Sequence, residues 1–280
     1  MKYLLLDYLL KLPGGGFLRE LYYFIVDSIR VFRQRLPSID LQLKIQNRVN
    51  DGITEFLYGD RQIRFFVPYA GIDGIQSFVV DKAQFWEASL LEATRKYLTK
   101  DSVVADCGAN VGNHTVFWAK VCNVKKIFAF EPQTIIGAIL RRNVKENGIG
   151  DVVEVIGKAL GNTPGFMSPA WDCPGNNMAM EYRYDDAGIV PVVTLDSISF
   201  EQLDFVKIDV EGGQLALLEG AKGTLSRFSP IIWIELNNHA SSPNYDRQKE
   251  LVGPQNLLAE LGYKLKERLS PVDYIYVKNF

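Results

Sequence analysis

Cysteine and histidine are scarce in this chain of 280 residues. It contains three cysteines and two histidines, and no two of the cysteines form a C-x-x-C pair. Three cysteines cannot build a disulfide framework, and so few thiols and imidazoles disfavour a zinc site or a histidine-rich metal centre. A reducing compartment is the simplest interpretation, so we expect a cytoplasmic protein.

An excess of charge of one sign is also absent. The chain has 31 Lys and Arg against 33 Asp and Glu, a formal net charge of -2. Without a basic excess we expect no nucleic-acid partner, because such proteins neutralise phosphates with Lys and Arg. A content of 47% hydrophobic and 23% charged residues is typical of a globular protein and excludes collagen-like or wholly disordered chains.

No apolar run near the N-terminus is long enough to span a bilayer, because charged residues interrupt residues 1–12. Residues 17–36 instead show apolar positions at helical spacing, followed by a cluster of arginines. Two interpretations stay open: a helical cap packed on the main domain or on a second copy in a homo-oligomer, and a basic helix lying on an anionic membrane. We expect the packed cap, with peripheral membrane contact through residues 1–37 as the alternative.

Residues 45–80 are typical of strands and turns. The runs 53–58 and 63–67 flank Gly59-Asp60, a pair that predicts a β-hairpin turn. A helix is predicted over 86–98 from its apolar spacing. We therefore expect a helical and hairpin extension over residues 1–80 and a main domain over residues 81–280.

Short apolar runs alternate with helical stretches after residue 100, which predicts a parallel sheet covered by helices on both faces. The predicted strands are 102–105, 126–130, 152–156, 205–208 and 230–236. A helix at 255–261 and an antiparallel pair at 263–268 and 274–278 close the chain. Acidic residues stand at the ends of four strands, where parallel sheets bind ligands: Asp106, Glu131, Asp209 and Glu235.

A glycine-rich loop follows the first of these strands, with the order DxGxNxG from Asp106 to Gly112. Its glycines permit a tight turn and close approach of a ligand, and the helix predicted at 115–121 begins just after it. Glu131 lies 19 residues beyond Gly112, where a carboxylate accepts hydrogen bonds from ribose hydroxyls. The spacing differs from the GxGxxG that a dinucleotide requires, which makes a nicotinamide dehydrogenase the weaker alternative.

The loop resembles the S-adenosylmethionine loop of class I methyltransferases, and further blocks resemble the FkbM family of methyltransferases. These blocks are residues 204–214 (DFVKIDVEGGQ), 218–221 (LEGA) and 230–235 (PIIWIE), with shorter matches at 159–161 and 194–196. The resemblance covers about residues 85–280. One departure is Gln214, which stands where the family has an acidic residue.

The resemblance implies a Rossmann-like class I methyltransferase fold, an α/β fold with a mostly parallel seven-stranded sheet, helices on both faces and an antiparallel C-terminal strand. It also implies S-adenosyl-L-methionine as cofactor and O-methylation of a glycan or secondary metabolite. The alternative is a catalytically inactive ligand-binding protein of the same fold.

The candidate cofactor-binding residues lie on the loop and at the strand ends. They are Asp106, Gly108, Asn110, Gly112, Glu131, Lys158, Ala159 and Asp209. Asp106 is expected to anchor the loop near the cofactor's ammonium group, and Lys158 and Ala159 to border the adenine. Asn110 either binds the cofactor carboxylate or caps the following helix.

The candidate catalytic residues are Asp209, His239 and Glu211, with Asp209 or His239 as acceptor of the substrate proton. His114 is expected to orient the loop or the substrate, and Lys207 to pair with an acid. Magnesium on the oxygens of Asp209, Glu235, Asn237 and Asn238 is an alternative that we do not favour. Residues 171–177 and 182–184 either contact the acceptor or pack as a surface loop.

Overall fold

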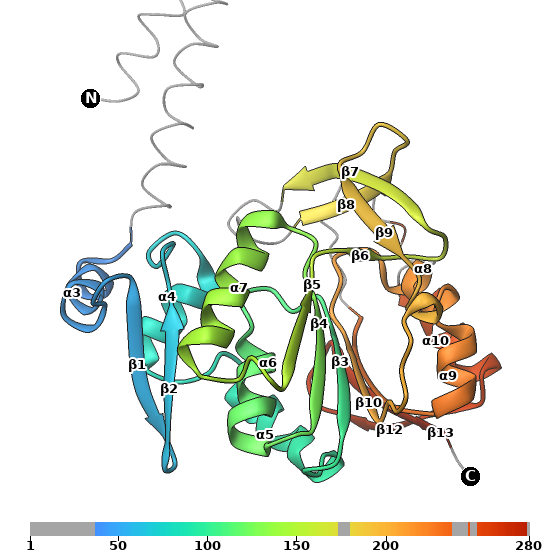
Figure 1. Ribbon diagram of the computed structural model, residues 1–280, viewed down its shortest axis with the longest axis horizontal. Coiled ribbons are helices and arrows are strands. Elements are labelled where there is room, and N and C mark those ends of the chain that lie inside the picture. The colour runs from blue at the N-terminus through green and yellow to red at the C-terminus, as the bar shows by residue number, and fades with distance from the viewer. Residues whose placement is uncertain (1–36, 173–179, 237–245, 247–250, 279–280) are drawn as a thin grey trace, which may run out of the picture.

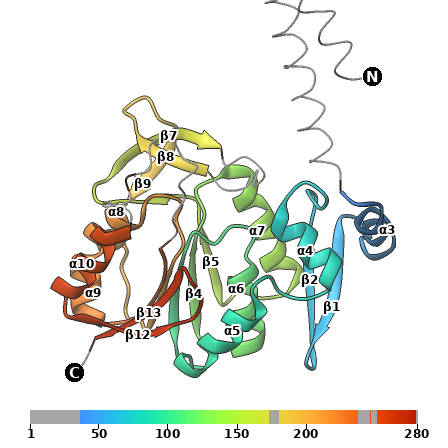
Figure 2. The same cartoon turned by 180° about the vertical axis from the view of Figure 1, so that it is seen from behind.

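The computed structural model describes residues 37–172, 180–236, 246 and 251–278 (Figures 1 and 2). The predicted helix at 17–36 lies outside these residues. Within the described part of the chain, no helix has the length and apolar character needed to cross a membrane.

A seven-stranded sheet forms the centre of the molecule, in the order β12-β13-β11-β10-β3-β4-β5. Its strands are β3 (Val103–Cys107), β4 (Lys126–Phe130), β5 (Val153–Ile156), β10 (Phe205–Ile208), β11 (Ile231–Glu235), β12 (Tyr263–Arg268) and β13 (Asp273–Lys278). Strand β13 runs antiparallel to both of its neighbours, whereas β11, β10, β3, β4 and β5 pair in parallel. The predicted mostly parallel sheet and its antiparallel C-terminal strand are confirmed.

Helices cover both faces of this sheet (Figure 1). One face carries α5 (Ala88–Thr94), α6 (Asn113–Phe117) and α7 (Thr134–Glu146), and the other carries α8 (Gln214–Glu219), α9 (Lys222–Phe228) and α10 (Gly253–Glu260). Each face has its own buried cluster, with Trp118 packed near Val104 on the first and Leu225 packed near Val206 on the second. Burial on both faces explains why the central strands are short continuous apolar runs.

The predicted hairpin is present as β1 (Ile53–Tyr58) and β2 (Arg61–Phe66), which pair antiparallel around the turn at Gly59-Asp60. Helices α3 (Ile39–Arg48) and α4 (Gly74–Lys82) lie beside it (Figure 2). Its aromatic side chains pack edge-to-face on the main domain, for example Phe65 and Phe56 on Phe85. The hairpin therefore shares the hydrophobic core of the sheet face that α6 and α7 cover.

Asn143 in α7 and Asn147 directly after it bond to the backbone of strand β2 in the hairpin. Asn143 Oδ1 accepts a hydrogen bond from the backbone N–H of Phe66 at 2.6 Å, and Asn147 Oδ1 accepts one from that of Arg64 at 3.1 Å. The same Asn143 side chain donates through Nδ2 to the carbonyl of Val111 in the glycine loop at 2.7 Å. One buried amide thus ties the hairpin to the loop.

We expect Asn143→Ala to lower the free energy of unfolding by about 2 kcal/mol, because it leaves a buried N–H and a buried carbonyl without partners. Urea denaturation measures this change. Gln62→Ala is the matched control, since this exposed amide bonds only to Glu55 within its own hairpin. Equal stabilities of the two variants would contradict the role of Asn143.

A second sheet of four strands, in the order β6-β9-β7-β8, was not predicted. It comprises β6 (Ala159–Leu160), β7 (Gly165–Asp172), β8 (Met180–Tyr184) and β9 (Val190–Val193). Strand β7 contains Pro169 next to a register shift, a position at which proline is tolerated in a strand. Because prolines and glycines interrupt this stretch, its sequence reads as a loop.

Candidate active site

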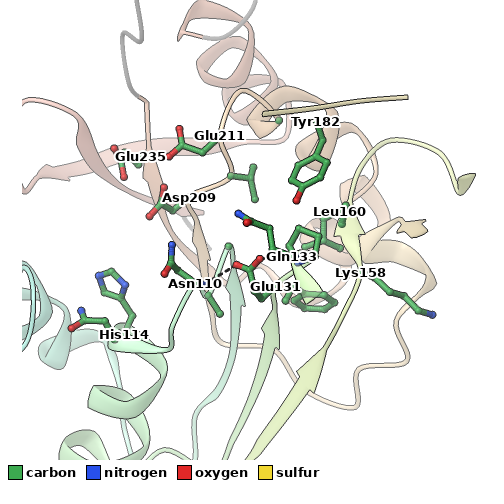
Figure 3. A pocket seen from close by; sticks show the side chains of 18 of the residues that line it. Asn110, His114, Glu131, Gln133, Lys158, Leu160, Tyr182, Asp209, Glu211 and Glu235 are labelled. Atoms are coloured by element: carbon green, nitrogen blue, oxygen red, sulfur yellow. Dashed lines mark hydrogen bonds between the residues drawn. The ribbon is translucent and has the colours of Figure 1, made fainter. Parts of the chain in front are cut away.

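A cavity of about 280 Å³ opens at the carboxyl ends of β3, β4, β10 and β11 (Figure 3). Its lining includes seven of the candidate residues: Gly108, Asn110, Glu131, Lys158, Ala159, Asp209 and Glu211. The second sheet adds Met167 and Tyr182 to one wall. Three of the four strand-end acids, Glu131, Asp209 and Glu235, therefore meet around one cavity, as expected for a parallel sheet.

Three further candidates lie elsewhere. Asp106 is fully buried beneath the loop, where Thr115 Oγ1 donates a hydrogen bond to its Oδ2. Gly112 begins α6 at the end of the loop and is not part of the cavity lining. His239 lies outside the described residues, as do the alternative magnesium ligands Asn237 and Asn238 and residues 173–177 of the candidate acceptor-contacting stretch 171–177.

The glycine loop passes so close to its neighbours that two positions cannot carry a side chain. Gly108 has φ +90°, and a Cβ there would lie 1.8 Å from the carbonyl oxygen of Asp209. Gly112 also has φ +90°, and its Cβ would lie 2.5 Å from a methyl group of Leu140. The two glycines therefore let the loop lie directly against Asp209 and Leu140, and Gly108 contributes its backbone to the cavity lining.

Glu131, at the end of β4, is held by the backbone on both sides. Its Oε2 accepts from the N–H of Asn110 at 3.0 Å, and its Oε1 accepts from the N–H of Gln133 at 2.8 Å. Burial raises the pKa of this carboxyl to about 7, although the two N–H groups oppose that shift. Each oxygen keeps a second lone pair, so the carboxylate can accept further hydrogen bonds from a ligand in the cavity.

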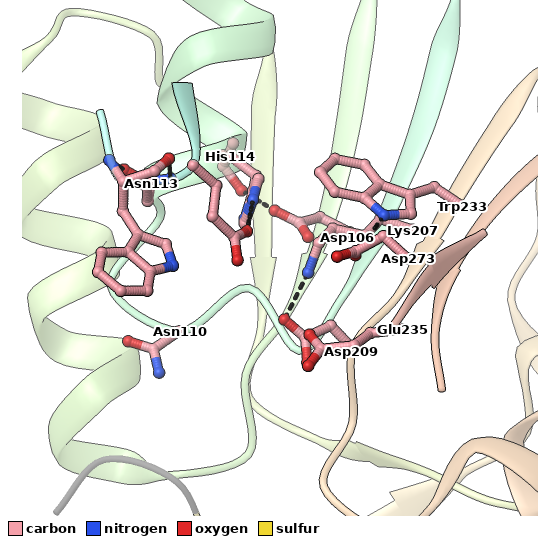
Figure 4. Close-up of polar contacts among 12 residues, drawn as sticks. Asp106, Asn110, Asn113, His114, Lys207, Asp209, Trp233, Glu235 and Asp273 are labelled. Atoms are coloured by element: carbon pink, nitrogen blue, oxygen red, sulfur yellow. Dashed lines mark hydrogen bonds and ion pairs between the residues drawn. The ribbon is translucent and has the colours of Figure 1, made fainter. Parts of the chain in front are cut away.

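An ion pair between a buried lysine and a partly exposed aspartate lies at the end of β10. Lys207 is 1% exposed, and its Nζ lies 2.6 Å from Asp209 Oδ2, as expected for a lysine that pairs with an acid (Figure 4). Burial alone would raise the pKa of Asp209, but the Lys207 ammonium holds it below its usual range. The negative charge of Asp209, together with burial, raises the pKa of Glu235 above its usual range. Lys207 thus favours the ionised form of Asp209, and Asp209 favours the protonated form of Glu235.

The residues before β3 were not expected to take part in the site, yet Trp86 and Glu87 line the cavity. Asn113 fixes them, because its Oδ1 accepts from the N–H of Trp86 at 2.9 Å and its Nδ2 donates to the Trp86 carbonyl at 2.9 Å. Glu87 Oε2 then lies 3.2 Å from His114 Nε2. The sequence carried no signal for this contact, because the burial of Asn113 beside Trp86 is evident only in the structure.

Metal-binding groups are not evident among the residues that the structure describes, since no cluster of three or more His, Cys, Asp or Glu side chains occurs there. The ammonium of Lys207 already supplies a cation between the carboxyl groups of β10 and β11.

The order and direction of the strands are those of the Rossmann-like class I methyltransferase fold, with the cavity at the ends of its parallel strands. A family model described as the methyltransferase FkbM domain matches residues 106–265. The chain therefore belongs to the FkbM methyltransferase family. A search of curated proteins finds no significant match.

Two solved structures illustrate how far the similarity extends. The methyltransferase FkbM from Methylobacillus flagellatus KT is 18% identical with a TM-score of 0.48, over 85% of this chain and 58% of that chain. An O-methyltransferase from Bacillus cereus in complex with SAH is 16% identical with a TM-score of 0.45, over 69% of this chain and 80% of that chain. This chain thus spans less than two thirds of the Methylobacillus protein.

Proposed function

We propose that this methyltransferase uses S-adenosyl-L-methionine to methylate a hydroxyl oxygen of a glycan or a secondary metabolite. The observation that carries this proposal is the position of Glu131, a buried carboxylate that faces a cavity floored by the bare backbone of Gly108. The two hydroxyls of a ribose can donate hydrogen bonds to such a carboxylate, and these bonds offset the free-energy cost of burying its charge.

The cavity residues fit the three parts of this cofactor. Glu131 accepts hydrogen bonds from the ribose hydroxyls, and Lys158, Ala159 and Leu160 form a wall suited to the adenine. The backbone from Gly108 to Asn110 lines the cavity and takes the methionine end. When bound, S-adenosyl-L-methionine supplies an electrophilic methyl group on a sulfonium.

The opposite end of the cavity suits an uncharged acceptor with hydroxyl groups. Asp209, Glu211 and Glu235 line it with carboxyl oxygens, which accept hydrogen bonds from hydroxyls. Trp86 and Tyr182 also line the cavity and add aromatic surface to it. Carboxyl groups beside aromatic rings are suited to bind sugars and other polyols, because they combine hydrogen bonding with apolar contact.

We expect Glu131→Gln to weaken the binding of S-adenosyl-L-homocysteine about 10- to 100-fold, because glutamine removes an ionised acceptor of two hydrogen bonds. Isothermal titration calorimetry measures this loss. Glu154→Gln, an exposed glutamate on the neighbouring strand β5, is the matched control and should change the affinity by less than about twofold.

The affinity of the unchanged protein should also depend on pH. Because the pKa of Glu131 is about 7, its carboxyl is protonated below that pH and accepts hydrogen bonds poorly. Affinity therefore falls as the pH drops below 7, by at most about tenfold per unit, and is constant well above it. The Glu131→Gln variant should lack this dependence; a parallel dependence in both proteins would assign it to another group.

Two measurements test the proposed function as a whole. Titration of the full chain with S-adenosyl-L-methionine should show saturable binding, and absence of binding at about 1 mM would refute the cofactor assignment. Incubation with methyl-labelled cofactor and fractionated cell extract, followed by mass spectrometry, should identify an O-methylated product. Cofactor binding without any transfer would instead support the inactive alternative.

A further inference from the structure

His114 and Glu87 form a polar pair inside the cavity. The Nε2 atom of His114 lies 3.2 Å from Glu87 Oε2, and both residues line the hollow (Figure 4). Burial alone would raise the pKa of Glu87, but the hydrogen bond with His114 holds it below its usual range. Since an ionised carboxylate only accepts hydrogen bonds, Nε2 of His114 is the nitrogen that carries the hydrogen.

The other imidazole nitrogen, Nδ1, is then an acceptor in the neutral ring. Among the residues that the structure describes, the imidazole of His114 has no hydrogen-bond partner besides Glu87. Its ring packs against two tryptophans, with centroid distances of 5.2 Å to Trp233 and 5.8 Å to Trp118. The imidazole therefore has one set tautomer and one set orientation, as a proton acceptor requires.

The backbone at Glu87 also has an unusual conformation. Glu87 has φ +55°, a left-handed conformation that residues other than glycine rarely adopt. The reciprocal hydrogen bonds between Asn113 and the backbone of Trp86 hold the preceding residue in place. Such unfavourable backbone conformations are found mainly at functional sites, where the surrounding structure enforces them. The conformation of Glu87 therefore supports a functional role for its carboxylate.

Other charged groups act on this pair from several elements. They are Lys207 on β10, Asp209 directly after it and Asp273 on β13, with Asp106 on β3 and Glu235 on β11 acting on Lys207 in turn. Lys207 pairs with Asp209 at 2.6 Å, so the lone pairs of Asp209 are partly engaged by an ammonium group. Asp209 is therefore a weaker proton acceptor than its place at the strand end indicates, and His114 lacks such a counter-ion on Nδ1.

We propose that His114 is the general base of the transfer reaction and that Glu87 is the residue that positions it. In the step, an oxygen lone pair of the acceptor forms a bond to the methyl carbon, and the carbon–sulfur bond breaks with its electron pair going to sulfur. The hydroxyl proton passes to His114 Nδ1, and the resulting imidazolium is stabilised by the Glu87 carboxylate. This inference rests on the proposed function and names the proton acceptor within it.

The chain has only two histidines, so NMR of the ¹⁵N-histidine-labelled full chain tests the geometry without an acceptor. The imidazole signals that disappear in His114→Gln belong to His114. We expect them to show hydrogen on Nε2, to shift when S-adenosyl-L-homocysteine is added, and to show mixed tautomers in Glu87→Gln. Hydrogen on Nδ1, or signals unaffected by S-adenosyl-L-homocysteine, would overturn the inference.

Transfer assays with the methyl-accepting extract fraction test the chemical role. We expect His114→Gln to slow transfer about 10²- to 10⁴-fold while cofactor affinity changes less than about threefold. Added imidazole should restore part of the activity of His114→Ala, which a purely structural role would not allow.

The remaining outcomes separate this inference from the proposed function. Failure of the unchanged protein to bind S-adenosyl-L-methionine refutes the proposed function itself. Normal binding with full activity of His114→Gln, or with activity lost only in His239→Gln, overturns the assignment of the base to His114. Loss of cofactor binding in His114→Gln to the same extent as transfer also overturns it, because His114 would then hold the cofactor.

Discussion

Gly108→Ala is expected to lower the free energy of unfolding by about 3–5 kcal/mol and to abolish cofactor binding. The added Cβ would lie 1.8 Å from the carbonyl oxygen of Asp209, a contact with backbone that no side-chain rotation relieves. Either β10 or the glycine loop must move, and both line the cavity. Urea denaturation gives the change in stability, and calorimetry with S-adenosyl-L-homocysteine gives the change in affinity.

Gly59→Ala is the control for backbone conformation. Gly59 also has a positive φ, +60°, but a Cβ there meets no atom within 4 Å. Its replacement should therefore cost only the left-handed conformation, about 1 kcal/mol, and leave binding unchanged. A Gly108→Ala variant that is no less stable than Gly59→Ala would show that the loop does not need the close approach to Asp209.

Lys207→Met is expected to destabilise the protein by about 2–3 kcal/mol at neutral pH, because it removes the ammonium group that pairs with a partly exposed carboxylate. Lys207 is fully enclosed, and methionine fills a similar volume without the charge. The carboxylate of Asp209 would then lack its cation. Thermal or urea unfolding measures the loss, and Lys264→Met on an exposed position of β12 controls for the substitution.

The pH dependence of this loss has a defined sign. Because Lys207 lowers the pKa of Asp209 below its value in the unfolded chain, the pair stabilises the protein above that unfolded value, near 3.9, and the benefit vanishes as the pH falls further. The gap in stability between the wild type and Lys207→Met should therefore narrow on acidification below pH 4. A gap that stays constant would assign the loss to packing.

The central sheet could be predicted because each of its strands carries its own signal. The run 205–208 is apolar at three of four positions, and its lysine proves to be a buried partner of Asp209. The small sheet could not be predicted, since Pro169 and several glycines interrupt its strands and its pairing is set by tertiary contacts.

The candidate site residues at the ends of strands could be predicted from the sequence, whereas those in the turn before β3 could not. Glu131 and Asp209 follow apolar strands, so the edge of the sheet brings them together. Glu87 shows no such signal, because it lies in a left-handed turn before a short helix, next to Trp86, whose backbone bonds to Asn113. A lone glutamate gives no hint of that geometry.

The wall formed by Trp86 and Glu87 has a consequence for how the cavity can diversify. Both residues, and Ile75 on α4, precede the stretch of residues 106–265 that matches the family. The glycine loop, Glu131 and Lys158 lie within that stretch. Mutations before residue 106 can thus reshape this part of the cavity while the glycine loop, Glu131 and Lys158 stay constant. The two parts of the cavity wall can therefore change independently in evolution, provided that Asn113, which bonds to the backbone of Trp86, is kept.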